Sequence, residues 1–65
     1  MNAMNCIEIS GESDSSFEDA IRAGLTRAVE TFRGIEAVQL DGEQLLISEG
    51  KVSGFRVTLT LSVAG

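Results

Sequence analysis

The stretch FRVTLTLSV, residues 55–63, decides the fold because apolar and polar residue types alternate along it without a break. This period of two is typical of a β-strand with one buried and one uncovered face. The predicted buried face consists of Phe55, Val57, Leu59, Leu61 and Val63, and the uncovered face of Arg56, Thr58, Thr60 and Ser62. A short chain with a single helical segment covers only one side of such a strand. The polar side must therefore meet water, a ligand or another subunit.

The segment before this strand, residues 35–48, is predicted to form a second and longer strand. Val38 and Leu40 are expected on one face of it, and Ala37 and Gln39 on the other. We expect Ala37 and Gln39 to flank the polar face of the strand that follows.

The alternation is interrupted at three places from residue 41 to residue 54, and these interruptions predict a hairpin with bulges. A bend or bulge is expected at Asp41-Gly42, a turn at Glu49-Gly50-Lys51, and a further bulge at Gly54. Residues 45–47 are apolar in succession, and three such residues cannot all face one helix. At least Leu46 is therefore expected to enter a subunit contact.

A helix is predicted upstream of these strands. Its start carries the S-x-x-E/D capping pattern, either as Ser15 with Glu18 or as Ser16 with Asp19. Apolar and small residues then follow at helical spacing: Phe17, Ala20, Ile21, Gly24, Leu25, Ala28, Val29 and Phe32. The helix is therefore expected to pack on the sheet.

Three glycines indicate boundaries and contacts. Gly11 is expected to end a short first strand that starts near Cys6. Gly24 costs about 1 kcal/mol of helix propensity relative to alanine, which favours close approach of a strand or another helix. Gly34 is expected to close the helix at C′, with Arg33 at the end that favours cations.

The predicted order is β-α-β-β, an α+β fold in a single domain over residues 1–65. A chain of this length has a thin core and needs an additional source of stability. Cys6 is the only cysteine and there is no histidine, so neither a disulfide nor a four-ligand structural zinc site is available. Oligomerisation remains, and the lone cysteine suits a reducing cytosol.

Charge and the amino end exclude several partners. The net charge is −5, with ten acidic and five basic residues, which disfavours nucleic acid. A local basic strip stays open, because Arg22, Arg27 and Arg33 lie close together in sequence. Residues 1–5 carry neither a signal peptide nor a membrane anchor, so we expect a cytoplasmic protein without membrane contact.

No catalytic constellation is present, so an enzyme is not expected. The sequence has no histidine, no Ser/His/Asp or Cys/His set and no glycine-rich phosphate loop. Glu12 with Asp14 indicates a solvated loop, and Glu18 with Asp19 indicates helix capping. A cation bound by carboxylates of an acidic assembly stays open, but no ligands are assigned.

Over nearly its whole length the chain resembles the dodecin family. The features that carry the resemblance are a first strand ending in Gly11, the helix start Ser16-Phe17-Glu18-Asp19-Ala20, Thr31-Phe32-Arg33 near the helix end, Gly50-Lys51-Val52 in the hairpin, and the strand Phe55-Arg56-Val57-Thr58-Leu59. The resemblance implies a three-stranded antiparallel sheet curled around one helix. It further implies a hollow homododecamer that binds flavin, as riboflavin or FMN, in pairs and without catalysis.

This sequence differs from the dodecin pattern at the positions of the flavin site. Dodecins place a flavin-stacking tryptophan early in the second strand and a glutamine, which bonds the polar edge of the ring, on the third. Here these positions are Ala37 and Arg56. Gln44 stands where an arginine or similar polar residue is usual, and Ala64 where a basic residue is usual. The resemblance thus implies flavin-pocket positions Ala37, Gln39, Gln44 and Arg56, with substitutions.

Loss of the tryptophan is expected to weaken flavin binding without abolishing it. Stacking on an aromatic side chain is worth about 1–3 kcal/mol, or roughly one to two decades of affinity. Arg56 could compensate by lying on the ring or by holding a phosphate or carboxylate. Alternatively, Arg56 pairs with Glu36 or another strand acid.

A second ligand site follows from the resemblance, since some dodecins are thought to bind coenzyme A near the helix end. The matching positions are Arg27, Thr31, Phe32 and Arg33. Arginines suit phosphate groups. The alternative is that the two arginines pair with Glu30, Glu36 or a neighbouring subunit and that Phe32 belongs to the core.

Two functions therefore stand. The first is a flavin-binding or flavin-storing dodecamer. The second is a dodecin-like shell that does not store flavin and instead binds coenzyme A or a cation, or serves a structural role. Quenching of riboflavin fluorescence separates the two.

Overall fold

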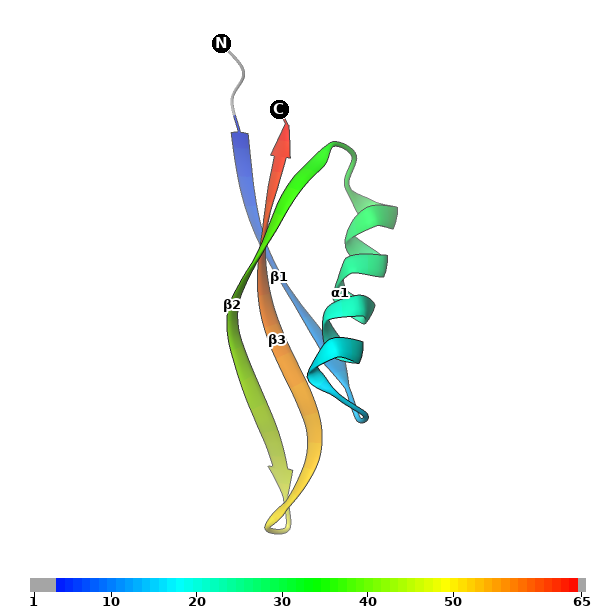
Figure 1. The fold of residues 1–65 in the computed structure, drawn as a ribbon, viewed down its shortest axis with the longest axis vertical. Helices are drawn as coiled ribbons and strands as arrows, with labels where there is room; N and C mark the ends of the chain where they lie inside the picture. Colours follow the sequence, from blue (N-terminus) through cyan, green and yellow to red (C-terminus); the bar gives the residue numbers. More distant parts are fainter. Residues whose placement is uncertain (1–3, 65) are drawn as a thin grey trace.

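The structure is a computed structural model that describes residues 4–64. In chain order its elements are β1 (Met4–Ser13), α1 (Phe17–Thr31), β2 (Ile35–Ser48) and β3 (Lys51–Ala64). Within this range the three strands form one antiparallel sheet in the order β1-β3-β2, and α1 lies against one face of it (Figure 1). The predicted β-α-β-β order and the three-stranded antiparallel sheet with one helix are confirmed for the described residues.

The central strand is β3, which carries the alternating sequence. Val57, Leu59 and Leu61 are buried, and the residues between them are half-buried. These apolar side chains pack against Ala20 and Ala28 of α1. The prediction that the odd-numbered face of this strand forms the helix-covered core is confirmed.

The helix begins at the second of the two predicted capping pairs. Ser16 is the N-cap of α1, and its hydroxyl accepts a hydrogen bond from the Asp19 amide at 3.0 Å. The Asp19 carboxylate accepts from the Ser13 hydroxyl at 2.7 Å, which ties the helix start to the end of β1. Phe17 meets Phe55 edge to face, with ring centroids 5.1 Å apart. The segment between β1 and α1 is thereby held to the sheet, by the Ser13–Asp19 hydrogen bond and by the Phe17–Phe55 contact.

Gly11 and Gly24 lie where β1 and α1 come closest. A Cβ on Gly11 would stand far inside van der Waals contact of the Ala20 carbonyl oxygen and 3.0 Å from the Gly24 nitrogen. The close approach predicted at Gly24 is confirmed. The prediction that the first strand ends at Gly11 was wrong, because β1 continues to Ser13 and Gly11 serves the helix contact. Glu12 is accordingly a strand residue and not part of a solvated loop.

The carboxyl end of the helix differs from the prediction by one residue. Phe32 is the C-cap, with extended backbone, and its N–H donates to the Ala28 carbonyl at 2.8 Å. Gly34 has a φ of +76° but stands at C″, beyond Arg33, so its predicted C′ placement was wrong. The Gly34 carbonyl accepts from the Ala64 amide at 3.0 Å, so the left-handed glycine brings the chain back to the end of β3.

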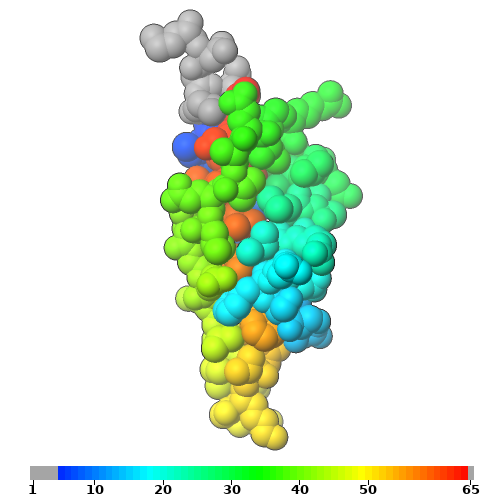
Figure 2. All heavy atoms as spheres, in the orientation of Figure 1, coloured from blue at the N-terminus to red at the C-terminus, as the bar shows by residue number. Residues whose placement is uncertain are grey.

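The long β2–β3 hairpin projects past the helix as a narrow extension (Figures 1 and 2). Its two turn residues, Glu49 and Gly50, have positive φ values of 52° and 76°, as a type I′ turn requires. Ser48 pairs with Lys51, so Lys51 is the first residue of β3. The prediction that Lys51 forms part of the turn was wrong.

Bulges interrupt the hairpin near both predicted places. Asp41 is unpaired between two ladder pairs, which confirms the first bulge. Ser53 is unpaired next to Gly54, which places the second bulge one residue from its predicted position. Leu46 covers this second bulge, with its Cδ1 3.3 Å from the Cβ position of Gly54.

Much apolar surface stays exposed, because α1 packs against β1 and β3 and leaves β2 largely uncovered. Leu45 and Ile47 are 52% and 59% exposed, whereas Leu46 is half-buried. The apolar surface at the hairpin thus depends on Leu45 and Ile47 more than on Leu46. Among the residues that the structure describes, the large exposed apolar ones are Val29, Val38, Leu40, Leu45, Ile47 and Val52.

Candidate functional site

The face of the sheet turned away from α1, the open face, is lined mainly by polar side chains. Strand register and alternation assign to it Cys6, Glu8, Ser10 and Glu12 of β1, Arg56, Thr58, Thr60 and Ser62 of β3, and Ala37, Gln39 and Gln44 of β2. Within residues 4–64 the only helix lies on the opposite face, so no element covers the open face. The polar side of the alternating strand is therefore available for a ligand or another subunit.

All four predicted flavin positions lie on the open face, but they form two separate groups. Across the β2–β3 ladder the pairs are Ala37 with Ser62, Gln39 with Thr60, and Gln44 with Arg56. Ala37 and Arg56 are thus separated by six residues along β3, or about 20 Å at ~3.3 Å per residue. The expectation that Ala37 and Gln39 flank the polar face of β3 is confirmed, since they pair with Ser62 and Thr60, and the residue opposite Arg56 is Gln44.

Arg56 forms an ion pair with a strand acid. Its Nε lies 3.0 Å from Oε2 of Glu12, the residue directly opposite on β1. The side chains are 42% and 54% exposed, so the pair is worth under about 1 kcal/mol. The alternative prediction, that Arg56 pairs with an acidic strand residue, is confirmed, but that residue is Glu12 and not Glu36.

Asp41 is a polar residue of the open face whose role the sequence did not reveal. Its carboxylate accepts hydrogen bonds from the Gln39 amide nitrogen at 2.9 Å and from the Thr60 hydroxyl. The bulge at Asp41 turns its side chain toward both partners. The sequence signal for the bulge was present, but only the strand register brings Thr60 beside it.

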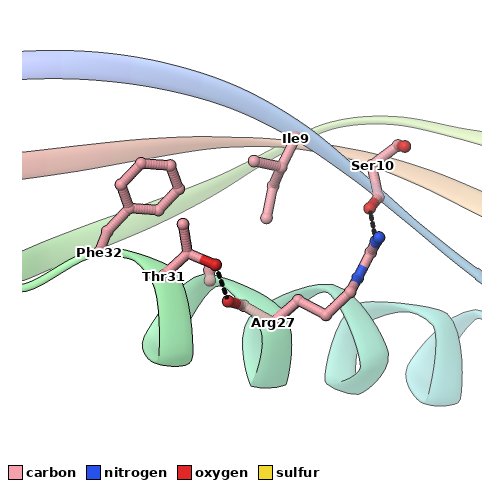
Figure 3. A pocket seen from close by; sticks show the side chains of 6 residues that line it. Ile9, Ser10, Arg27, Thr31 and Phe32 are labelled. Atoms are coloured by element: carbon pink, nitrogen blue, oxygen red, sulfur yellow. Dashed lines mark hydrogen bonds between the residues drawn. The ribbon is translucent and has the colours of Figure 1, made fainter.

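Three of the four positions predicted to contact coenzyme A, Arg27, Thr31 and Phe32, meet in a pocket of about 250 Å³ between α1 and β1 (Figure 3). Arg27, Thr31 and Phe32 line it together with Ile9, Ser10 and Ala28. The Arg27 guanidinium reaches across and donates to the Ser10 carbonyl, and the Thr31 hydroxyl donates to the Arg27 carbonyl at 2.8 Å. The pocket therefore has an apolar wall and one cationic group.

Arg33 does not belong to that pocket. It lines a neighbouring hollow with Val29, Phe32, Gly34 and Ile35. Phe32 borders both and also packs on the core cluster around Leu61. The alternative that Phe32 is a core residue is thus correct, and the two arginines do not converge on one ligand within a single chain.

Within residues 4–64, no group of three or more acidic or cysteine side chains is placed to hold a metal ion. The helix of the same residues is too short and too polar to cross a membrane. Cys6 is a free and exposed cysteine on β1.

Comparison with known proteins decides the family. The family model described as Dodecin matches residues 4–64. The chain belongs to the dodecin family. The match covers all four elements, so the helix, hairpin and open face described above are those of a small dodecin.

Solved dodecin structures agree with this membership. An arginine-to-alanine variant of the T. thermophilus dodecin is 26% identical, with a TM-score of 0.90 and coverage of 100% of this chain and 97% of that chain. Dodecin from Streptomyces coelicolor is 25% identical, with a TM-score of 0.90 over 98% and 91% of the two chains. Dodecin from Streptomyces davaonensis, at 20% identity, shares the fold with a TM-score of 0.89 over 98% and 94%. No curated protein matches the chain.

Proposed function

We propose that this dodecin is a non-enzymatic protein that assembles into a hollow homododecamer and binds flavin, as riboflavin or FMN, weakly on its open face. The observation that carries the proposal is the placement of Ala37, Gln39, Gln44 and Arg56 on one uncovered sheet face. The tryptophan is absent, yet the scaffold that presents its position is retained. The protein is expected to be cytoplasmic, with itself and a small-molecule ligand as partners.

Two copies of the chain are needed to complete one flavin site. The roughly 20 Å between Ala37 and Arg56 exceeds the length of an isoalloxazine ring system, so one ring does not touch both residues of one chain. A second copy laid antiparallel against the open face would bring its own Arg56 near the first copy's Ala37. Flavin binding and assembly are therefore linked in this proposal.

Weak affinity follows from the side chains at the site. Ala37 offers no ring for stacking, which costs about 1–3 kcal/mol. Arg56 is already engaged by Glu12 at 3.0 Å, so a flavin must share the guanidinium with that carboxylate. A dodecin with these residues is expected to bind riboflavin one to two decades more weakly than one with the tryptophan.

The shape of the chain supports assembly. Its radius of gyration is 13.4 Å and its extents are 51 × 18 × 13 Å. A compact chain of this length has a radius of gyration of about 11 Å. The extra length lies in the hairpin, where Leu45, Ile47 and Val52 are each more than half exposed. Burial of these residues against other copies would provide the core that one chain lacks.

Replacing Leu40 with aspartate is expected to break the assembly. Leu40 lies on β2 and is 45% exposed beside the apolar residues that α1 leaves uncovered. A carboxylate buried between copies without a partner costs several kcal/mol. Light scattering after size exclusion should give about twelve times the 6.9 kDa of one chain for the wild type and a smaller species for Leu40→Asp.

The matched control is Ser48→Asp, which adds the same charge at an exposed polar position of the same strand. This variant should keep the wild-type mass. A wild type that runs as a monomer would contradict the proposal, and so would a Leu40→Asp variant with unchanged mass at nanomolar concentration.

A second candidate function is supported by the pocket at Arg27, Thr31 and Phe32. In this alternative the shell binds coenzyme A, and the Arg27 guanidinium exchanges its Ser10 carbonyl for a ligand phosphate. It predicts bound coenzyme A together with unquenched riboflavin fluorescence. If the protein binds flavin instead, riboflavin fluorescence is quenched and coenzyme A is not bound.

A further inference from the structure

The outer edge of β1 is long and regular. β1 is an edge strand, because the sheet order is β1-β3-β2. Its ladder with β3 runs over ten residues, from Met4 to Ser13, without a register shift. The other edge strand, β2, is interrupted by bulges at Glu36 and Asp41. Bulges are one device by which native sheets discourage edge-to-edge pairing, and the described ladder of β1 has none.

The direction of the backbone groups of β1 follows from the strand pairing. The Ala64 N–H donates to the carbonyl of Gly34, the residue directly before β2, so the backbone groups of Ala64 point to the β2 side of β3. Groups of successive strand residues point to opposite sides, so those of Thr58 also point to β2. Thr58 and its partner Ser10 therefore form a non-hydrogen-bonded pair, and the N–H and C=O of Ser10 point outward to the free edge of β1.

Arg27 of α1 caps one of these outward groups. Its guanidinium reaches over the edge of the sheet and donates to the Ser10 carbonyl (Figure 3). Among the residues that the structure describes, Ser10 is the only one of β1 whose carbonyl accepts a hydrogen bond from a side chain. A strand added at this edge would need the same carbonyl as an acceptor. Arg27 and an added strand therefore compete for it.

A second copy of β1 is a strand whose charges fit this edge. In an antiparallel pair of two such strands, one register sets Ser10 opposite Glu8 and Glu12 opposite Cys6. The neighbouring registers set Glu8 opposite either Glu8 or Glu12, and like charges directly opposite each other are destabilising. The first register avoids these pairs, and it uses the Ser10 carbonyl of both chains.

We propose that Arg27 closes the free edge of β1 to strand pairing, and that the partner it keeps out is β1 of a second copy. Without this cap, the second strand would join antiparallel and extend the sheet across two chains. The edge of β1 is separate from the open face, so the inference stands whether or not the protein binds flavin.

Removing the cap is expected to raise the mass of the protein. Arg27→Ala should form a species of at least twice the wild-type mass, in a fraction that rises with protein concentration, as measured by light scattering after size exclusion. Hydrogen exchange at the Glu8 and Ser10 amides should be slower than in the wild type. Arg27→Lys, which keeps a donor of similar reach, should retain the wild-type mass. So should Arg22→Ala, which removes the same charge from the exposed, ion-paired side of the helix.

A double variant separates edge pairing from aggregation of unfolded chains. Ser10→Pro removes an outward N–H that takes no part in the β1–β3 ladder, a position at which edge strands tolerate proline. Added to Arg27→Ala, it should restore the wild-type mass. Arg27→Ala with the wild-type mass and unchanged exchange in β1 overturns the inference. A heavier species that persists in the double variant, or one that forms equally in Arg22→Ala, also overturns it.

Discussion

Replacing Gly11 with alanine is expected to destabilise the protein by about 1–3 kcal/mol or more, a large share of its total stability. The new methyl group would overlap the Ala20 carbonyl oxygen and lie 3.1 Å from the Gly24 Cα, and both are backbone atoms of a helix. Overpacking of this kind costs about 1–3 kcal/mol or more. A chain of this length has a total stability of about 3–10 kcal/mol.

The neighbouring glycine provides the matched comparison. A Cβ on Gly24 would meet only the Leu59 Cδ1 at 3.1 Å, the far end of a side chain that can rotate. Alanine also gains about 1 kcal/mol of helix propensity there, so Gly24→Ala should be nearly neutral. Gly42→Ala, with nothing within 4 Å, should also be neutral. Urea unfolding followed by circular dichroism, at one fixed chain concentration, measures all three.

If Gly11→Ala unfolds at the same urea concentration as the wild type, the contact of α1 with β1 is not the close backbone packing described above. A large loss in Gly42→Ala would indicate instead that the strands tolerate no added side chain. Either result would remove the explanation given for Gly11.

Replacing Ala37 with tryptophan is expected to raise riboflavin affinity by one to two decades. Ala37 is exposed on the open face, opposite Ser62, so an indole fits there without displacing the core. Stacking on the isoalloxazine ring then adds about 1–3 kcal/mol, and about 1.4 kcal/mol corresponds to tenfold. The measurement is quenching of riboflavin fluorescence by the purified variant.

A tryptophan elsewhere on the same strand separates specific from general stacking. Glu43→Trp places the indole on the other face of β2, opposite Val57, and should leave the affinity unchanged. Equal gains in the two variants would show that flavin adheres to any exposed indole. If riboflavin affinity does not rise in Ala37→Trp, the open face differs from a flavin site in more than the missing tryptophan.

The elements of the fold follow from local patterns. Alternation from Phe55 to Val63 predicted the buried face of β3, and the Ser16-Asp19 spacing predicted the helix start. Both signals lie within a few residues of chain, so no knowledge of the tertiary structure is needed. The same holds for Asp41, where the sequence already favoured a bulge.

The errors concern contacts between distant segments. A glycine such as Gly11 often ends a strand, which is why the sequence predicted an end there. Only the close approach of α1 explains why β1 continues through it. The partner of Arg56 depends on the β1–β3 register, which joins residues 44 positions apart in the chain. Neighbours of this kind are set by how the strands align, and alternation alone leaves that alignment open.

The most direct test of the central claim is a riboflavin titration of the size-selected wild-type protein. We expect an assembly of about twelve times the 6.9 kDa chain mass that quenches riboflavin fluorescence and binds, at saturation, two flavins per pair of chains. Riboflavin that stays fully fluorescent at high protein concentration, or quenching by a monomeric fraction, would contradict it.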